Sequence, residues 1–201
     1  MLNAINLSCV RGDRTLFAGL DLCVGAGEWL HVRGGNGTGK TSLLRLLAGL
    51  SAPAAGEIRW NGSPVREIGE DYRGDLLYLG HQAGVKEDLT ALENLELAAG
   101  LDGCESRPGD VLAALGRFGL KGREDLPVRF FSAGQKRRVL LARLVSRRAK
   151  LWILDEPFTA LDTGAVEMLG ELVAEHIAEG GMAVITSHQA VPIAGGRRLD
   201  L

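Results

Sequence analysis

One glycine-rich segment near the N-terminus restricts what this chain can fold into. Residues 34–41, GGNGTGKT, have glycine, lysine and threonine at every fixed position of the pattern G-x-x-x-x-G-K-[ST]. The apolar stretch Trp29–Arg33 predicts a β-strand before it, and Thr41–Ala48 predicts a helix after it that ends at Gly49. Glycines let successive backbone N–H groups turn toward one anion, and a helix N-terminus adds partial positive charge. The segment therefore predicts a phosphate-binding loop between a strand and a helix.

Two side chains of this loop carry chemistry of their own. Lys40 is long enough to reach the β- and γ-phosphates of a nucleotide as a point charge. The hydroxyl of Thr41 is a suitable ligand for Mg²⁺. The other positions contribute backbone N–H groups and small side chains. The candidate nucleotide-binding residues of the loop are Gly34, Gly35, Asn36, Gly37, Thr38, Gly39, Lys40, Thr41 and Ser42.

A second candidate site follows an apolar segment in the C-terminal half. Leu151–Leu154 predicts a buried strand, and the carboxylates of Asp155 and Glu156 come directly after it. Ligands of open α/β sheets bind at the carboxyl ends of the strands. Asp155 is then placed to hold Mg²⁺, and Glu156 to polarise an attacking water as general base. Taken alone, the pair is also compatible with two solvated carboxylates at the end of a strand.

Composition and charge narrow the class of protein. The chain has 201 residues, 46% of them hydrophobic and 24% charged, which suits one α/β domain with its own core. A net charge of −2 gives no support for nucleic-acid binding. There is no apolar run of about 18 residues and no signal-peptide pattern, so we expect a cytoplasmic chain that reaches a membrane only through a partner. The cysteines, Cys9, Cys23 and Cys104, lack CxxC spacing and are expected to be reduced.

The rest of the chain alternates short apolar segments with helical ones, as expected for a sheet with crossover helices. Further strands are predicted at Leu2–Cys9, Asp21–Val24, Gly56–Trp60, Asp75–Leu79 and Ala183–Thr186. Capping boxes at Thr90-x-x-Glu93 and Ser132-x-x-Gln135 predict helix starts, and Asp110–Phe118 and Thr163–Glu179 predict further helices. We expect a single domain over residues 1–201, with a small helical subdomain inserted at about residues 85–130.

A run of basic residues follows the second capping box. It comprises Lys136, Arg137, Arg138, Arg143, Arg147, Arg148 and Lys150. We interpret it as a solvated face of a helix that ends at about Arg147, near the nucleotide site, rather than as a nucleic-acid surface. The histidines His31, His81 and His176 receive no role from the sequence.

Residues 131–135, FSAGQ, resemble the LSGGQ signature of the ABC ATPase superfamily. The resemblance extends along nearly the whole chain: Gln82 matches the glutamine loop, Asp162 the D-loop and His188 the switch histidine, in the order of the family. It implies an α/β fold. That fold is a P-loop NTPase core (an ABC-type nucleotide-binding domain) with an N-terminal antiparallel β part and a small inserted α-helical subdomain.

The resemblance also implies an assembly and a set of roles. The family pattern is a head-to-tail homodimer in the ATP-bound state, with ATP and Mg²⁺ as cofactors. Each ATP then lies between the phosphate loop of one chain and the signature of the other, here Ser132, Ala133, Gly134 and Gln135. The implied catalytic residues are Glu156, His188, Lys40 and Gln82, and the implied metal ligands are Thr41, Gln82 and Asp155. Asp162 would couple the two sites.

Two positions depart from the family pattern. Phe131 and Ala133 stand where leucine and glycine are usual, and the methyl group of Ala133 lies next to the expected phosphate position. The aromatic residue expected to stack on adenine is missing near Arg11, which leaves Arg11 as the candidate to cover the base through a cation–π contact.

Four segments resemble the ATPase subunit of bacterial cytochrome c maturation systems: Leu79–Lys86, Leu89–Leu95, Leu151–Asp162 and Gly180–Gln189. This implies a role in haem export or haem delivery on the cytoplasmic side of the bacterial inner membrane. The implied partners are integral membrane transporter subunits, contacted through Ala83–Leu95 and the inserted helices, and indirectly a periplasmic haem chaperone. The alternatives are an ABC transporter for another cargo, such as a lipid, drug or ion, and a non-transport ABC ATPase.

Overall fold

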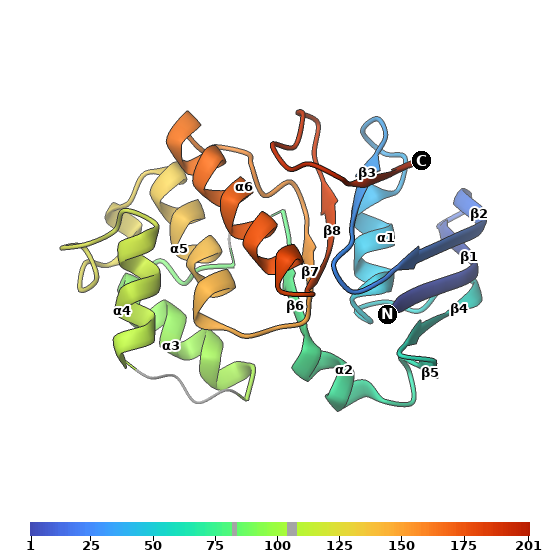
Figure 1. The fold of residues 1–201 in the computed structure, drawn as a ribbon, viewed down its shortest axis with the longest axis horizontal. Coiled ribbons are helices and arrows are strands. Elements are labelled where there is room, and N and C mark those ends of the chain that lie inside the picture. Colours follow the sequence, from blue (N-terminus) through green and yellow to red (C-terminus); the bar gives the residue numbers. More distant parts are fainter. Residues whose placement is uncertain (82–83, 104–107) are drawn as a thin grey trace.

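The computed structural model describes residues 1–81, 84–103 and 108–201. Two sheets and the helices that pack on them form the fold, with the antiparallel sheet at one end and a group of helices at the other (Figure 1). The α/β class and the N-terminal antiparallel part that we expected are confirmed.

The antiparallel sheet is built from β1 (Leu2–Arg11), β2 (Arg14–Val24), β4 (Ala55–Trp60) and β5 (Ser63–Pro64), in the order β2-β1-β4-β5. The strand predicted at Asp21–Val24 is wrong at its start, because β2 begins at Arg14. Register shifts interrupt the pairing of β1 with β2, and most of the first half of β2 is exposed. The period-2 pattern that marks a half-buried strand is therefore absent there.

The second sheet is parallel and five-stranded, in the order β6-β7-β8-β3-β9. Its strands are β3 (Trp29–Arg33), β6 (Leu76–Leu79), β7 (Leu151–Leu154), β8 (Met182–Thr186) and β9 (Arg197–Asp200). The sequence analysis missed β9. This edge strand, RRLD, has no buried residue, so it carries no apolar signal.

The two faces of the parallel sheet contribute to two different cores. Leu77, Leu79, Trp152, Leu154, Ala183 and Ile185 pack in one core, and Leu76, Leu151, Ile153, Met182 and Val184 pack in the other. This alternation follows from the period of a strand, whose successive side chains point to opposite faces. Because both faces are covered there, the inner strands β7 and β8 are buried along their whole length and almost entirely apolar, as expected for a parallel sheet.

The helices cover both faces. They are α1 (Lys40–Leu47), α2 (Gly69–Asp75), α3 (Ala91–Leu101), α4 (Pro108–Arg117), α5 (Ala133–Ser146) and α6 (Thr163–Ala178), with a 3₁₀ turn at Val128–Phe130. Both predicted capping boxes are present. The short helix α2 was not predicted. Within the described ranges of the chain, no helix has the length and apolarity needed to cross a bilayer.

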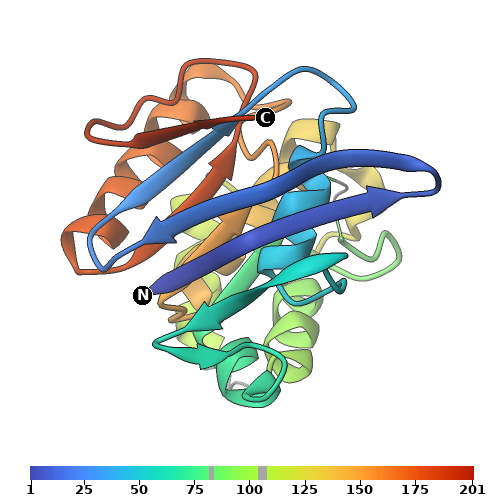
Figure 2. The ribbon, with the colours of Figure 1, turned by 90° about the vertical axis from the view of Figure 1, so that its right-hand side faces the viewer.

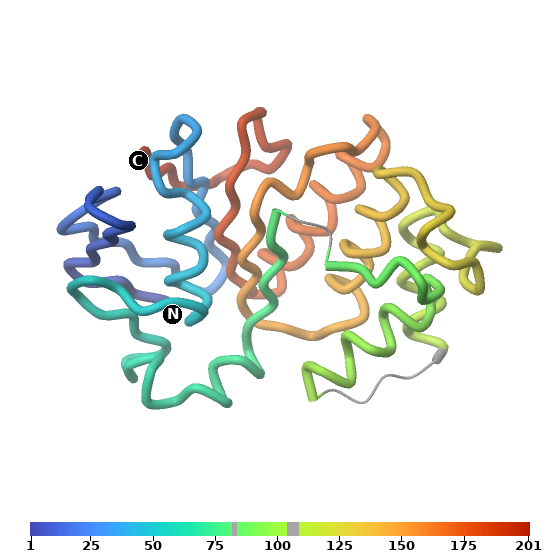
Figure 3. The backbone as a smooth tube through the Cα atoms, turned by 180° about the vertical axis from the view of Figure 1, so that it is seen from behind, coloured from blue at the N-terminus to red at the C-terminus, as the bar shows by residue number. Residues whose placement is uncertain are grey.

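The layers place α1 between the sheets. Its leucines share a core with β1, β4, β7 and β8, and the β1–β2 hairpin crosses in front of it (Figure 2). Helices α3, α4 and α5 pack on one another at the far end of the molecule. Seen from behind, α2 links the antiparallel sheet to β6 along one edge (Figure 3). Strands β7, β8 and β3 are neighbours in the parallel sheet, so their carboxyl ends lie side by side at one edge of it.

The basic run of residues 136–150 is exposed only at Arg148 and Lys150, and its members within α5 do not form a solvated face, contrary to our interpretation. The side chain of Arg137 is buried, with 5% of its surface exposed. Arg143 and Arg147 are partly buried and form ion pairs with Asp102 at 3.1 Å and 2.9 Å. The prediction failed because the carboxylate and carbonyl groups that receive these cations lie far away in the sequence.

Candidate functional site

A cavity of about 440 Å³ opens where β3, β7 and β8 end. This is the edge of a parallel sheet at which ligands bind in open α/β folds. It brings the phosphate loop together with the acidic pair and the histidine after β8, both of which lie more than a hundred residues beyond the loop in the sequence. Its lining residues are Leu16, Gly35, Asn36, Gly37, Gly39, Lys40, Thr41, Ser42, His81, Asp155, Glu156 and His188.

The backbone of the phosphate loop requires glycine at two positions in particular. Gly34 has φ of 149°, and a Cβ there would lie 2.6 Å from Oγ1 of Thr38. Gly39 has φ of 110°, and a Cβ there would lie 3.2 Å from Leu16. Both are backbone conformations that residues with side chains rarely adopt. The loop can therefore curl tightly and begin α1 at Lys40 only with glycine at these positions.

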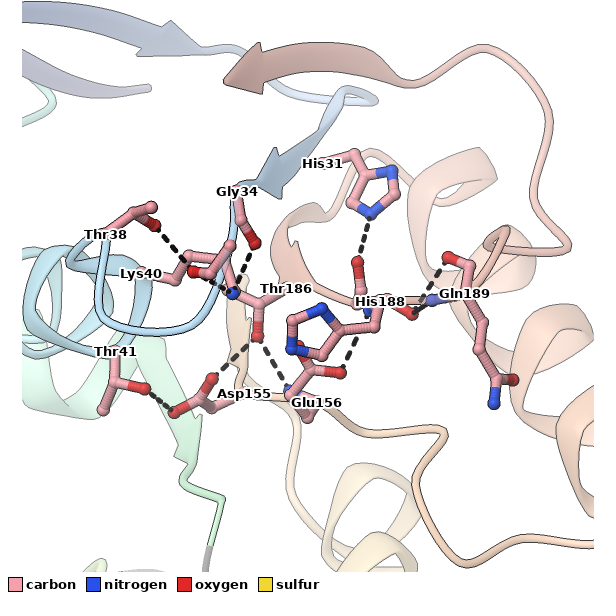
Figure 4. Close-up of polar contacts among 12 residues, drawn as sticks. His31, Gly34, Thr38, Lys40, Thr41, Asp155, Glu156, Thr186, His188 and Gln189 are labelled. Atoms are coloured by element: carbon pink, nitrogen blue, oxygen red, sulfur yellow. Dashed lines mark hydrogen bonds and ion pairs between the residues drawn. The ribbon is translucent and has the colours of Figure 1, made fainter. Parts of the chain in front are cut away.

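Lys40 is held over the curled loop. Its Nζ donates to the carbonyl oxygen of Gly34 at 2.7 Å and to that of Gly35 at 3.1 Å (Figure 4). Only 8% of the residue is exposed. A lysine ammonium is a compact charge on a flexible stem, so it can exchange these carbonyl oxygens for phosphate oxygens without moving the loop.

Thr41 and Asp155 meet across the cavity, although they come from α1 and from the end of β7. The hydroxyl of Thr41 donates to Oδ2 of Asp155 at 2.8 Å. The hydroxyl of Thr186, at the end of β8, donates to Oδ1 of the same carboxylate at 2.7 Å and accepts from the backbone nitrogen of Glu156 at 2.8 Å. Figure 4 shows this chain of hydrogen bonds. Sequence reasoning missed Thr186, whose only signal was a hydroxyl at the end of an apolar strand.

The donor set at Thr41 and Asp155 fits a magnesium ion. Hydroxyl and carboxylate oxygens are hard ligands, and Mg²⁺ is usually bound through one or two such groups together with water and substrate phosphate. In the part of the chain that is described, no group of three or more His, Cys, Asp or Glu residues could hold a metal ion. The two oxygen donors of Thr41 and Asp155 suit a metal that arrives with a phosphate ligand.

Glu156 lies buried at the cavity wall in an unusual backbone conformation. Its φ is 49°, a left-handed value that costs a residue with a side chain about 1 kcal/mol or more. Oε2 accepts a hydrogen bond from the backbone nitrogen of His188 at 3.2 Å. Oε1 is buried and makes no hydrogen bond to any residue that the structure describes, although Nε2 of His188 approaches it to 3.5 Å. One oxygen of this carboxylate is therefore anchored, and the other can accept a proton donor.

His188 is half exposed. The residue before it, Ser187, is contacted by His31 on β3. Nε2 of His31 lies 3.3 Å from the carbonyl oxygen of Ser187, and the imidazole is 8% exposed. Burial lowers the pKa of His31, with the Ser187 carbonyl acting in the opposite sense. A neutral ring then donates its Nε2 proton to Ser187. No pattern in the sequence assigned His31 this position.

The signature residues lie outside the cavity of their own chain. The hydroxyl of Ser132 accepts from the backbone nitrogen of Gln135 at 3.2 Å, and Oε1 of Gln135 accepts from the backbone nitrogen of Ser132 at 2.9 Å. Two backbone N–H groups at the start of α5 are thus hydrogen-bonded by side chains of the same turn. A Cβ at Gly134 would lie 3.0 Å from the carbonyl oxygen of Ala160. The signature therefore packs directly on the segment that leads to Asp162.

Asp162 has two partners within the chain. Its Oδ1 accepts from the backbone nitrogen of Ala165 at 2.9 Å and so caps α6. Its Oδ2 forms an ion pair with Arg138 on α5. The carboxylate therefore ties the helix of the signature to the segment after the acidic pair.

The remaining candidate residues fall in three places. Arg11 lies exposed at the end of β1 and does not line the cavity, where Leu16 of β2 is found instead. Gly34 and Thr38 shape the loop rather than line the cavity, and Thr38 Oγ1 donates to the Gly35 carbonyl at 3.0 Å. Gln82, like Ala83, lies outside the described residues.

Comparison with known proteins identifies the family of this chain. The family model described as ABC transporter matches residues 17–159. A cytochrome c biogenesis ATP-binding export protein, CcmA, from Dechloromonas aromatica is 56% identical over 201 residues, covering 100% of this chain and 98% of its own. The protein of the same name from Escherichia coli K12 is 50% identical over 206 residues, covering 100% and 96%.

The fold is shared with a solved structure. A putative ABC transporter ATP-binding protein from Pyrococcus furiosus has a TM-score of 0.86 at 24% identity, covering 100% of this chain and 96% of its own. This likeness shows the fold alone, whereas the family match and the relatives that align over the whole chain identify the family. The chain belongs to the ABC transporter family and, within it, to the cytochrome c biogenesis ATP-binding export proteins.

Proposed function

We propose that this chain is the ATP-hydrolysing subunit of a membrane transporter that exports or delivers haem for the biogenesis of c-type cytochromes. Its relatives, which are cytochrome c biogenesis ATP-binding export proteins, support this process. The observation that carries the ATPase role is the hydrogen-bonded chain from Thr41 through Asp155 and Thr186 to Glu156. It joins a phosphate loop to a metal-binding carboxylate and to a second carboxylate with one free oxygen.

The phosphate loop binds the triphosphate in this proposal. Backbone N–H groups of the loop and Nζ of Lys40 surround the β- and γ-phosphates and balance their charge. Thr41, Asp155 and Gln82 would hold Mg²⁺, which would supply positive charge to stabilise the leaving group. Because the loop is rigid and preorganised, it stabilises the charge that develops in the transition state without reorganising.

The second carboxylate acts on water. Oε1 of Glu156 accepts a proton from the attacking water as general base, while Oε2 stays bound to the backbone of His188. The His188 imidazole, half exposed beside the same carboxylate, contacts the γ-phosphate. One charge-stabilising contact of this kind contributes roughly 3–4 kcal/mol to the transition state. Gln82 links this site to the membrane subunits.

The signature implies a second copy of the chain. Ser132 and Ala133 are exposed at the start of α5, whose N-terminus carries partial positive charge, and they do not line the cavity of their own chain. In the proposed ATP-bound homodimer this helix start meets the γ-phosphate held by the partner copy. Asp162 then connects the two sites through its position beside the signature. The helices between about residues 85 and 130 act as an inserted subdomain of the single domain, residues 1–201.

A second cavity supports docking of a membrane subunit. It has a volume of about 1020 Å³ and lies between the segment after α1, helix α2 and the C-terminal end of α3. Exposed leucines line it, Leu50 at 53% and Leu101 at 80%, and its arginines include Arg143 and Arg147, which are ion-paired with Asp102 in the same lining. We assign this cavity to a cytoplasmic segment of an integral membrane subunit that presents an apolar face to these leucines. The chain would then sit on the cytoplasmic face of the inner membrane.

The proposal limits what this chain itself contacts. The haem and the periplasmic haem chaperone would be reached through the membrane subunits, so the chain needs no cargo site.

A Leu101→Glu variant should lose the membrane subunits on affinity purification while binding ATP normally, because a charge would enter the docking cavity. Leu112→Glu, on the outer face of α4 at 45% exposure, is the matched control. Identification of the co-purified proteins by mass spectrometry also decides between haem and another cargo.

The ATPase role is tested by Glu156→Gln. The amide keeps the shape of the side chain but cannot accept the proton, so turnover should fall by at least about 100-fold while ATP binding persists. The ATP-bound homodimer should accumulate and be visible by size-exclusion chromatography with light scattering. Glu171→Gln, on the exposed face of α6, is the control. Turnover at the wild-type rate in Glu156→Gln would rule out the general-base role.

A further inference from the structure

Arg137 is a buried cation on α5, five residues after Ser132. Its guanidinium donates to four backbone carbonyl oxygens: those of Glu156 at 2.8 Å, Asp155 at 3.2 Å, Gly80 at 3.3 Å and Pro157 at 3.4 Å. Three of these carbonyls belong to consecutive residues of the turn after β7. The fourth belongs to the segment that leads from β6 toward position 82.

Burying this charge is costly, and the carbonyl groups offset that cost. Burial lowers the pKa of Arg137, while the nearby carboxylates of Asp155 and Glu156 act in the opposite direction. The planar guanidinium presents its N–H donors in a fixed fork, so it can satisfy several carbonyl groups at once in one orientation. A lysine has three donors on a single rotating nitrogen and cannot reproduce that arrangement.

The hydrogen bonds act on both sides of Glu156. Its backbone N–H donates to the hydroxyl of Thr186, and its carbonyl oxygen accepts from Arg137. With both flanking peptide groups held, the residue is kept at φ of 49°, where it would otherwise be strained. The direction of the Cα–Cβ bond, and so the position of the carboxylate, depends on these two contacts.

We propose that Arg137 is a positioning residue for ATP hydrolysis, which holds Glu156 in place from the helix that begins at the signature. The inference rests on the general-base role proposed for Glu156. The capping box of Ser132 and Gln135 makes the first turns of α5 rigid, so a shift of the signature moves the guanidinium with it. In a homodimer, the signature that meets the partner's nucleotide would thereby adjust the general base of its own chain.

The test compares three variants of the full chain. Arg137→Met should lower kcat by about 100-fold, the effect of a misplacement of about 1 Å, and should change KM for ATP less than threefold, because Arg137 does not line the nucleotide cavity. Arg137→Lys should fall between this variant and the wild type. Arg148→Met, at an exposed position just beyond α5, removes the same charge and should leave kcat unchanged.

A double-mutant cycle separates positioning from a general loss of structure. Combined with Glu156→Gln, the Arg137→Lys substitution should cause no further loss of the residual single-turnover rate, since there is no base left to misplace. Additive losses, or an Arg137→Met variant with wild-type kcat, would overturn the inference. If Arg137→Met fails to fold by circular dichroism, the Arg137→Lys cycle still decides. Full turnover in Glu156→Gln alone would instead defeat the proposed base.

Discussion

The hydroxyl of Thr186 donates a hydrogen bond to Oδ1 of Asp155 across 2.7 Å at the buried end of the parallel sheet. The hydroxyl oxygen of Thr186 also accepts a hydrogen bond from the backbone nitrogen of Glu156 at 2.8 Å. One side chain on β8 therefore orients both carboxylates that follow β7. Because Thr186 is fully buried, no water can replace it without a rearrangement.

A Thr186→Val substitution should reduce both stability and turnover. Valine has nearly the same shape, but it leaves the Glu156 N–H and one oxygen of Asp155 without a partner. Leaving such a buried group unpaired costs about 1–3 kcal/mol. We expect the free energy of unfolding, measured by urea denaturation, to fall by about that amount. Thr186→Ser retains the hydroxyl and should recover most of the loss in both measurements.

Lys40→Met should weaken ATP binding more than it weakens the fold. The lysine donates to two carbonyl oxygens of its own loop, whereas two charge-assisted contacts to phosphate would contribute roughly 3 kcal/mol, or about 100-fold in Kd. Isothermal titration calorimetry with Mg-ATP measures this change. Lys121→Met, exposed before the signature, is the control. Equal affinity in Lys40→Met and the wild type would contradict the role of the loop.

Gly134→Ala should affect turnover rather than folding. The added Cβ would lie 3.0 Å from the carbonyl oxygen of Ala160, so the segment leading to Asp162 must shift by a few tenths of an ångström. Alanine also favours the helix by up to about 1 kcal/mol, which offsets the crowding. We expect an unchanged melting temperature and a lower ATPase rate. Gly116→Ala in α4 meets no atom within 4 Å and should raise stability slightly without altering the rate.

The chain should lose stability as the pH falls below about 6.5, partly because of His176. This imidazole stacks on Trp152 with centroids 3.8 Å apart, and its Nε2 lies 3.1 Å from the Met182 carbonyl. Burial lowers the pKa of His176, with the Met182 carbonyl acting in the opposite sense, and burial lowers the pKa of His31 likewise. The unfolded chain therefore binds protons first as the pH falls, and the free energy of unfolding decreases with it.

His176→Phe tests this pH dependence. Phenylalanine keeps a ring against Trp152 and loses the titrating group together with its bond to Met182. The variant should be less stable than the wild type at pH 7.5, and the difference should shrink toward pH 5.5. Parallel stability curves for the two proteins between these values would show that His176 does not titrate as described.

Several features of the site could be predicted because they depend on neighbours in the sequence. The spacing of residues 34–41 predicted the loop between β3 and α1. The capping boxes at Thr90 and Ser132 close within three residues, and both were found. The short strand β9 and the first half of β2 were missed because exposed strands carry no apolar period.

The sequence by itself determined the phosphate loop, the acidic pair and most of the apolar strands and capped helices, because local spacing decides backbone conformation. Only the tertiary structure decided which distant groups meet: Thr186 with Asp155, Arg137 with the carbonyl of Glu156, and Leu16 rather than Arg11 at the cavity. Such contacts depend on how the strands of the sheet are ordered. Whether a charge such as that of Arg137 is solvated or buried follows from that order and not from the residues beside it.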